Sequence, residues 1–278
     1  MKIGTYHQLE VLRDTSVGLF LGDGSGNEVL LPNKYVPAHA KKGKLLDVFV
    51  YTDSEDRPIA TTLKPLIRLG EFACLRVKDV SKVGAFLDWG LEKDLLVPFR
   101  EQKEKMKVGK SYIVYLRLDE VTQRLVATAK LHKIFDKGTT QLEEGQEVDL
   151  IIGEGTEIGI EVVINHRYRG MLFRNEIFQD VMFGDLVKGY IKHVREDGKI
   201  DVSLRKTGMD NLEAGAQKIL TELKANDGFL PLHDKSDPED IQFQLEMSKK
   251  NFKRSLGTLY KKKLVLLEKT GVRLLKKH

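Results

Sequence analysis

Short apolar runs recur along the chain and are separated by Gly, Asp and Lys. Between residues 70 and 130 the runs are FACLRVKDV, AFLDWG, DLLVP, SYIVYLRLDE and RLVATAK. Runs rich in Val, Ile, Leu and Phe, interrupted about every ten residues, indicate β-strands. Residues 99–108 are the polar, helix-compatible segment among them. Five short strands with a short helix before the fourth predict a small closed barrel, because closure leaves no strand edge exposed.

This pattern occurs three times. An offset of 66 residues superimposes the first copy on the second: Gly4, Gly18 and Gly43 match Gly70, Gly84 and Gly109. An offset of 75 carries those glycines to a third copy, at Gly145, Gly159 and Gly184. The aromatic positions Tyr6 and Phe20 recur as Phe72 and Phe86, but become Glu147 and Glu161 in the third copy. The third copy therefore keeps the framework and loses the aromatic pair, which suits a spacer or a docking surface.

The sequence pattern changes from strand-like to helical after residue 206. Residues 212–225 and 248–261 each repeat apolar positions at helical spacing, and in the second segment Phe252, Leu256, Leu259 and Tyr260 are expected to share one face. Asp237 before Pro238, and Ser248, are candidate N-caps. Two extended runs around Lys269-Thr270-Gly271 predict a hairpin. Helix, strand, helix, helix and hairpin is the order of a winged helix-turn-helix.

The run from Gly70 to Lys130 resembles the RNA-binding domain first described in ribosomal protein S-one. The matching features are Gly70, Gly84-Ala85-Phe86, Leu95-Leu96-Val97, Val108-Gly109 and the closing segment Leu125 to Lys130. Taken whole, the chain resembles the bacterial conserved virulence factor B family. The resemblance implies a mainly β multidomain protein of three tandem five-stranded OB-type barrels and an α+β winged helix-turn-helix. The expected domains are 1–66, 67–140, 141–206 and 212–278.

The resemblance also implies a stacking role for the aromatic pairs, Phe72 and Phe86 in the second copy and Tyr6 and Phe20 in the first. Exposed rings on such barrels stack on unpaired bases. The alternative is that these rings fill the barrel interior. Side chains alternate along a strand, so if Ala85 and Leu87 face the core, Phe86 faces outward.

Charge is distributed unevenly. The chain has a net charge of +5, but residues 67–140 alone carry +5, residues 141–206 carry −4 and residues 248–278 carry +10. Positive charge concentrated on the second copy and the carboxyl end suits contact with phosphates. The candidate phosphate ligands near the second copy are Lys78, Lys82, Arg117, Arg124 and Lys130. The alternative is an ordinary solvated surface.

In the winged helix the basic candidates for nucleic-acid contact are Lys249, Lys250, Lys253, Arg254, Lys261, Lys262 and Arg273. The helix over 248–261 would be the recognition helix. Such domains also bind proteins, so duplex nucleic acid and a protein partner both remain open.

The remaining composition argues against other classes. One cysteine, Cys74, excludes an internal disulfide framework, and we expect it to be a small buried thiol. The seven His are scattered, and no nucleophile–base spacing is evident, so we expect no enzyme, no cofactor and no metal. Asp53 to Arg57 is acidic enough to suggest a cation, but a solvated turn explains it more simply. The amino-terminal sequence lacks a secretory h-region, and no apolar run approaches a membrane span, so a cytoplasmic protein without membrane contact is expected.

These observations predict a cytoplasmic RNA-binding protein with single-stranded RNA as its partner, and the resemblance implies a regulatory role. Each barrel would bind weakly, and the linked barrels would gain affinity through effective concentration. Two alternatives stay open: a DNA-binding transcription regulator that uses the winged helix, and a protein-interaction scaffold.

Overall fold

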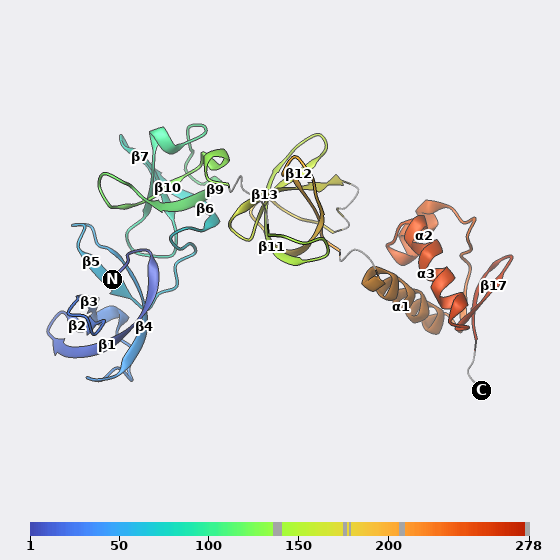
Figure 1. The fold of residues 1–278 in the computed structure, drawn as a ribbon, viewed down its shortest axis with the longest axis horizontal. Helices are drawn as coiled ribbons and strands as arrows, with labels where there is room; N and C mark the ends of the chain where they lie inside the picture. The colour runs from blue at the N-terminus through green and yellow to red at the C-terminus, as the bar shows by residue number, and fades with distance from the viewer. Residues whose placement is uncertain (136–140, 175–176, 178, 206–208, 276–278) are drawn as a thin grey trace.

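Three small β-barrels follow one another along the chain, and a helical domain follows them (Figure 1). This computed structural model describes residues 1–135, 141–174, 177, 179–205 and 209–275. The expected fold class is confirmed: two barrels close completely, the second nearly does, and the carboxyl-terminal elements have the order of a winged helix.

Barrel one closes in the strand order β1-β2-β3-β5-β4. Its strands are β1 (Thr5–Thr15), β2 (Gly18–Gly22), β3 (Glu28–Pro32), β4 (Leu45–Thr52) and β5 (Pro58–Thr61). Alternate residues of β1 and β4, such as Leu9, Val11 and Val48, fill the interior. A bulge between Val11 and Arg13 lets the long β1 bend away from β4 and pair with β2.

Barrel two repeats this arrangement in the order β10-β9-β6-β7-β8, and β8 lies beside β10. Its strands are β6 (Phe72–Val80), β7 (Gly84–Asp88), β8 (Leu95–Pro98), β9 (Ser111–Leu118) and β10 (Leu125–Thr128). The short helix expected before the fourth strand is a 3-10 helix of three residues, Phe99–Glu101, and the rest of the helix-compatible segment, residues 102–108, is not helical. The buried Gln102 side chain instead donates to the Val97 carbonyl and accepts from the Met106 N–H, and these bonds replace helical ones.

Barrel three closes in the order β11-β12-β13-β15-β14. Its strands are β11 (Glu147–Gly155), β12 (Gly159–Ile164), β13 (Tyr168–Phe173), β14 (Leu186–Val194) and β15 (Ile200–Ser203). The interior is aliphatic, with Leu150, Ile164 and Val202 fully buried. Loss of the aromatic pair in this copy therefore leaves the core intact.

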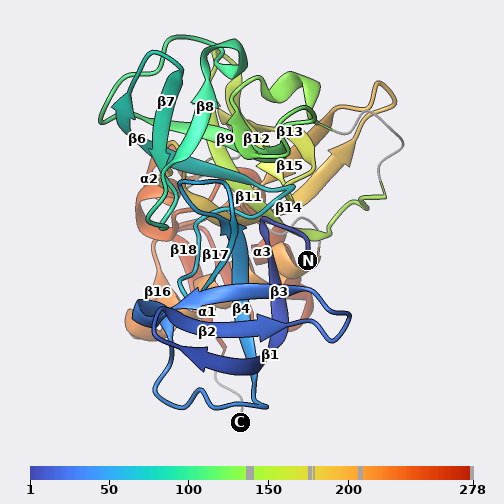
Figure 2. The same cartoon turned by 90° about the vertical axis from the view of Figure 1, so that its left-hand side faces the viewer.

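Neighbouring barrels are packed against each other. Phe49 and Tyr51 of barrel one join the core of barrel two through Trp89, and Figure 2 shows these two barrels one above the other. Phe72 and Ile113 of barrel two pack on Ile151 and Val163 of barrel three. Apolar contacts on both sides of barrel two restrict the motion of the barrels relative to one another.

The carboxyl-terminal domain consists of α1 (Met209–Ala225), β16 (Phe229–Leu230), α2 (Pro238–Leu245), α3 (Lys249–Lys261), β17 (Val265–Glu268) and β18 (Gly271–Leu274). Both expected N-caps are confirmed: Asp237 accepts from the N–H of Glu239, and Ser248 from that of Asn251. The sheet order β16-β18-β17 places the predicted hairpin beside the helices as a wing. Side chains of residues 206–213 lie outside the described residues.

Candidate functional site

The rings on β2 and β7 face outward. Ala85 and Leu87 are fully buried, and Phe86 between them is half-exposed, as the alternation predicted. Phe20 has the same setting on β2, and the Arg13 guanidinium lies 4.1 Å from its ring centroid. Each ring stands opposite a half-exposed leucine on the next strand, Leu30 or Leu96. Both barrels thus present an accessible apolar face around one ring.

A further exposed apolar residue, which the sequence patterns did not single out, lies just before the repeated glycine at the start of the second strand in each copy. Val17, Val83 and Ile158 are 57%, 58% and 59% exposed, which is unusual for β-branched apolar side chains. Their carbonyls accept N–H hydrogen bonds at 3.2, 3.4 and 3.3 Å from the residue that follows the third strand: Asn33, Phe99 and Arg174. The signal was available, because these residues align under the same 66- and 75-residue offsets.

The glycine that follows explains why this geometry repeats. A Cβ on Gly18, Gly84 or Gly159 would collide with a carbonyl oxygen of the third strand. Only glycine lets the hairpin lie this close to that strand. Three features together are called the apolar platform of a barrel: the exposed residue before the glycine, the ring three positions after that residue, and the end of the third strand. In barrels one and two it comprises Val17, Phe20 and Pro32, and Val83, Phe86 and Pro98.

Phe72 does not belong to a platform. Its ring is 1% exposed and stacks on Phe135 at 5.2 Å, between barrels two and three. Phe86 pairs with Asp79, seven residues beyond Phe72, so the rings lie roughly 23 Å apart along β6 at about 3.3 Å per residue. The prediction that Phe72 stacks on a base is wrong, because the adjoining barrel covers the ring.

Tyr6 occupies the equivalent place in barrel one. It is 41% exposed and packs edge-on against Phe49 at 5.3 Å. Partial burial raises its pKa, and nearby Arg68 lowers it. Phe20 pairs with Arg13, seven residues beyond Tyr6, so these two rings also lie far apart. The structure therefore does not bring together the expected aromatic pair in either barrel.

Most of the candidate phosphate ligands of barrel two already form ion pairs with carboxylates of the protein. Lys78 pairs with Asp94 at 2.8 Å, and the hydrogen bond raises the lysine pKa. Arg117 pairs with Glu101 at 2.9 Å, and Arg124 pairs with Asp56 of barrel one. Lys82 is exposed, Lys130 is half-buried, and neither side chain has a partner within the described part of the chain. Of the five candidates, Lys82 and Lys130 could therefore bind a phosphate without first giving up a carboxylate partner.

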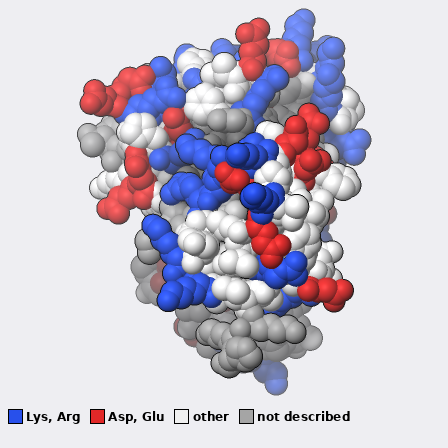
Figure 3. Space-filling view, turned by 90° about the vertical axis from the view of Figure 1, so that its right-hand side faces the viewer, with Lys and Arg blue, Asp and Glu red and all other residues white. Residues whose placement is uncertain are grey.

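Helix α3 carries a face of exposed basic side chains. Lys250, Lys253, Arg254 and Lys261 are exposed, and Phe252, Leu256 and Leu259 are buried on the other side. The expected place of Tyr260 on the buried face is wrong, since it is 53% exposed. Figure 3, which views the molecule from this end, shows Lys and Arg gathered across the middle of the face.

The other basic candidates of this domain differ from one another. Lys262 is exposed and Lys249 half-buried, and among the described residues neither has an ion-pair partner. Arg273 pairs with Glu268 at 2.7 Å, which raises the arginine pKa, and its guanidinium lies 4.9 Å from the Phe229 ring centroid. The charge available to a ligand is therefore concentrated on α3 rather than on the wing.

Barrel three carries a hollow at its platform position. A cavity of about 630 Å³ is lined by residues that include Ile158, Phe173, Arg195 and Lys199. The Arg195 guanidinium lies 5.6 Å from the Phe173 centroid and pairs with Asp201 at 2.9 Å. Phe173 stands where the other copies have Pro32 and Pro98. The third copy thus lacks a ring on its second strand but has one at the end of its third.

Among the described residues, no three His, Cys, Asp or Glu side chains cluster in a way that could hold a metal ion. No helix in the described part of the chain is long and apolar enough to cross a bilayer.

Two family models match the chain. The S1 domain model matches residues 3–63 and 69–130, and the CvfB-like winged helix domain model matches residues 217–274. The matched segments cover barrels one and two and most of the carboxyl-terminal domain. The chain is a protein of tandem S1 domains followed by a winged helix.

Similar proteins show which family of S1-domain proteins the chain belongs to. YitL of Bacillus subtilis, described as uncharacterized, is 30% identical over 94% of this chain and 90% of its own length. Conserved virulence factor B of Staphylococcus epidermidis is 26% identical over 99% of this chain and 95% of its own. The chain belongs to the CvfB family. A crystal structure of a multidomain protein with nucleic acid binding domains from Streptococcus pneumoniae covers 99% of both chains, with 24% identity and a TM-score of 0.42.

Proposed function

We propose that this protein binds single-stranded RNA, without catalysis, and acts as a post-transcriptional regulator in the cytoplasm. The observation that carries the proposal is the apolar platform, which recurs with the same backbone geometry in barrels one and two. A half-exposed ring on the barrel surface suits the face of an unpaired base, whereas bases in a duplex offer no free face.

Cations near the platforms support phosphate contact. Lys82 lies in the β6–β7 hairpin next to Val83, and Lys130 follows β10. Lys78 and Arg117 would exchange their carboxylates for phosphates, and such partly exposed ion pairs contribute only about 0–1 kcal/mol to stability. The relative described as Conserved virulence factor B aligns with 99% of this chain, and the regulatory part of the proposal follows that resemblance.

The basic face of α3 would add a second, electrostatic contact. Its exposed cations are spread along a single helix, so they can follow a phosphate backbone. Because the barrels are packed into one body, a strand held on one platform raises the local concentration of RNA at the others and at α3.

Binding of a labelled oligouridylate, measured by fluorescence anisotropy over a range of salt concentrations, tests the proposal. Changing Phe20 and Phe86 together to Ala removes both rings. Since each stacked base contributes about 1–3 kcal/mol, the double variant should bind at least tenfold more weakly. Phe243→Ala is the matched control, because Phe243 is 89% exposed on α2, outside every platform, and its loss should leave affinity unchanged.

Two results would redirect the proposal. A preference for duplex DNA over the oligouridylate at equal salt would favour a DNA-binding regulator that uses α3 as a recognition helix. Unchanged affinity of the Phe20/Phe86 double variant, with the fold intact, would remove stacking from the mechanism.

A further inference from the structure

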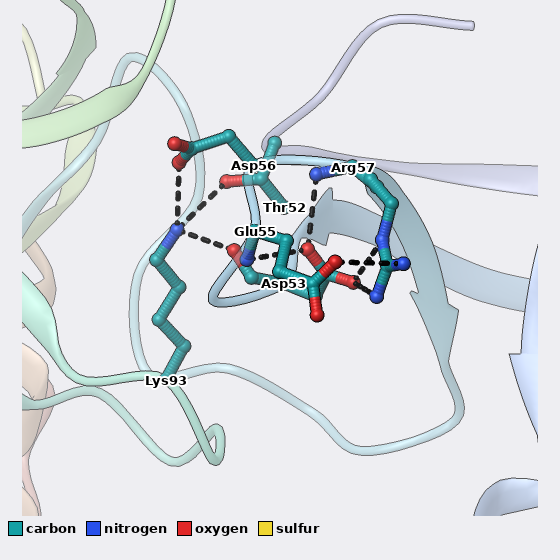
Figure 4. A network of polar contacts seen from close by, with 6 residues as sticks. All are labelled: Thr52, Asp53, Glu55, Asp56, Arg57 and Lys93. Carbon is teal, nitrogen blue, oxygen red and sulfur yellow. Dashed lines mark hydrogen bonds and ion pairs between the residues drawn. The ribbon is translucent and has the colours of Figure 1, made fainter.

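The acidic turn Asp53–Arg57 of barrel one holds a cation, but the cation belongs to barrel two. Figure 4 shows the Lys93 ammonium directed into this turn. Its Nζ donates to the Asp53 carbonyl at 2.6 Å, to Asp56 Oδ1 at 3.1 Å and to Thr52 Oγ1 at 3.3 Å. The expected solvated turn is thus a contact between barrels.

Within the turn, the acidic side chains have different partners. Asp53 accepts from the N–H groups of Glu55 and Arg57 at 2.9 and 3.0 Å and from the Arg57 guanidinium at 2.8 and 2.9 Å. Glu55 also pairs with Arg57, at 2.9 Å. Asp56 alone is turned toward barrel two, where it pairs with both Lys93 and Arg124. One carboxylate therefore receives two cations of the neighbouring barrel.

Lys93 and Arg124 lie close together on the surface of barrel two. Lys93 precedes β8 and Arg124 precedes β10, and these strands lie side by side. Leu96, the partner of Phe86 in the ladder, is three residues beyond Lys93, or roughly 10 Å along the strand. Here two cations, Lys93 and Arg124, contact one carboxylate near the ring of Phe86. The same two cations could hold the phosphate of one nucleotide while the base of the next nucleotide stacks on Phe86.

We propose that Lys93 and Arg124 form a phosphate site of barrel two and that Asp56 of barrel one occupies it as a competing anion. The inference rests on the proposed RNA binding and adds its regulation. RNA must displace Asp56 to reach the site, so barrel one lowers the RNA affinity of barrel two. The half-exposed carboxylate, with 33% of its side chain accessible, is open to such exchange.

The experiment is the substitution Asp56→Asn. Asp56 has a φ of 63°, in the left-handed region that asparagine tolerates well, so the turn should keep its backbone. Loss of the charge frees Arg124 and weakens the hold on Lys93. Oligouridylate should bind more tightly, and the slope of log affinity against log salt should steepen by about 0.7 for each phosphate gained.

Glu55→Gln is the matched control. It removes the same charge one residue away, but within the described residues the Glu55 carboxylate pairs only with Arg57 of its own turn. This control should reproduce any general effect of added positive charge and leave the salt slope unchanged. Adding Arg124→Gln to the Asp56→Asn variant should return the slope to that of the unchanged protein. Equal slopes for Asp56→Asn and Glu55→Gln, or weaker binding by Asp56→Asn, would overturn the inference.

A second readout does not depend on RNA. Inorganic pyrophosphate is titrated into both proteins, and the Arg124 side-chain Nε–H resonance is followed by ¹⁵N NMR. A saturable shift is expected in Asp56→Asn and not in the unchanged protein. If the shift occurs and neither protein binds oligouridylate, the anion site stands and the proposed function fails. If RNA binds but the Arg124 resonance responds equally in both proteins, Asp56 does not compete and the inference fails.

Discussion

The two junctions between barrels use the same repeat position in different ways. Tyr6 packs on Phe49 at 5.3 Å and Phe72 packs on Tyr115 at 4.8 Å, and both residues of the first pair map onto the second with the 66-residue offset. Yet Tyr6 is 41% exposed and Phe72 only 1%. A repeat therefore conserves the local pair, while the neighbouring barrel decides whether its outer ring is a surface.

The surroundings of the pairs account for this difference. At the first junction, Phe49 meets Trp89 edge-on at 6.0 Å, and ion pairs from Lys93, Arg124 and Lys34 surround the contact. At the second, Phe72 is covered by Phe135 from the segment after β10 and by aliphatic residues of barrel three. The first junction combines apolar packing with exchangeable charge, whereas the second relies mainly on apolar packing.

The largest effect is expected at the second junction, from Phe72→Ala. Removal of a fully buried aromatic ring leaves a cavity, and such changes destabilise proteins by about 3–5 kcal/mol. The loss should appear in chemical denaturation as a shift of the transition that reports on barrels two and three. Tyr6→Ala at the first junction, and Phe86→Ala on the platform, should each cost clearly less. Similar losses for Phe72 and Tyr6 would mean that the two junctions do not differ as described.

The next largest effect concerns His166, which is specific to the second junction. Its Nδ1 accepts the Phe72 N–H at 3.0 Å, so His166→Ala leaves a donor beside a buried ring without its partner. An unsatisfied buried donor costs about 1–3 kcal/mol. His166→Asn is the informative companion, because it keeps an acceptor and tolerates the positive φ of 53°. Equal destabilisation by both substitutions, in the same denaturation assay, would assign the effect to lost packing instead.

The sequence was sufficient for the fold because its signals are local and repeated. Strand runs, the glycines that only fit without a Cβ, and the caps Asp237 and Ser248 all act within one barrel or one helix. The outward direction of Phe86 followed from alternation along one strand. The segment 99–108 shows the limit: its helix is a 3-10 helix that ends at Glu101, and beyond it the buried Gln102 side chain bonds to the backbone.

The residues of the candidate site were harder to predict from the sequence, because their exposure and partners depend on contacts between repeats. Nothing local distinguishes Phe72 from Phe86, and the first is buried by Phe135 together with the docked barrel three. The partner of Arg124 lies 68 positions earlier in the chain, on another barrel. Val17, Val83 and Ile158 were readable from the repeat, but exposed aliphatic residues are easily taken for core.

A smaller effect should separate the polar parts of the junctions. Lys93 and Asp56 are 35% and 33% exposed, whereas Lys103 and Glu154, which link barrels two and three at 3.0 Å, are 68% and 67% exposed. Lys93→Gln should lower the free energy of unfolding by roughly 1 kcal/mol, and Lys103→Gln by close to none, because exposed pairs are screened by solvent. Both are measured by denaturation at two salt concentrations. A larger loss for Lys103→Gln would reverse the ranking of the junctions' ion pairs.

The smallest expected effect is on the chemistry of Cys74, which lies on β6 at the second junction with its Sγ against the backbone at Gly184. Burial, and then the negative charge of Asp185, raise the pKa of this thiol. A raised pKa leaves less thiolate at any given pH, so alkylation by iodoacetamide at pH 8 should be slower than for the unfolded chain, and its pH–rate curve should lie at higher pH.

Phe72→Ala should accelerate the alkylation of Cys74, because loosening barrel three returns water to the thiol and lowers its pKa toward the ordinary value. Lys93→Gln, which disturbs only the first junction, should leave the rate unchanged. An equal acceleration by both variants would show that barrels one and two loosen together with barrel three, and the two junctions would then be one cooperative unit rather than two independent contacts.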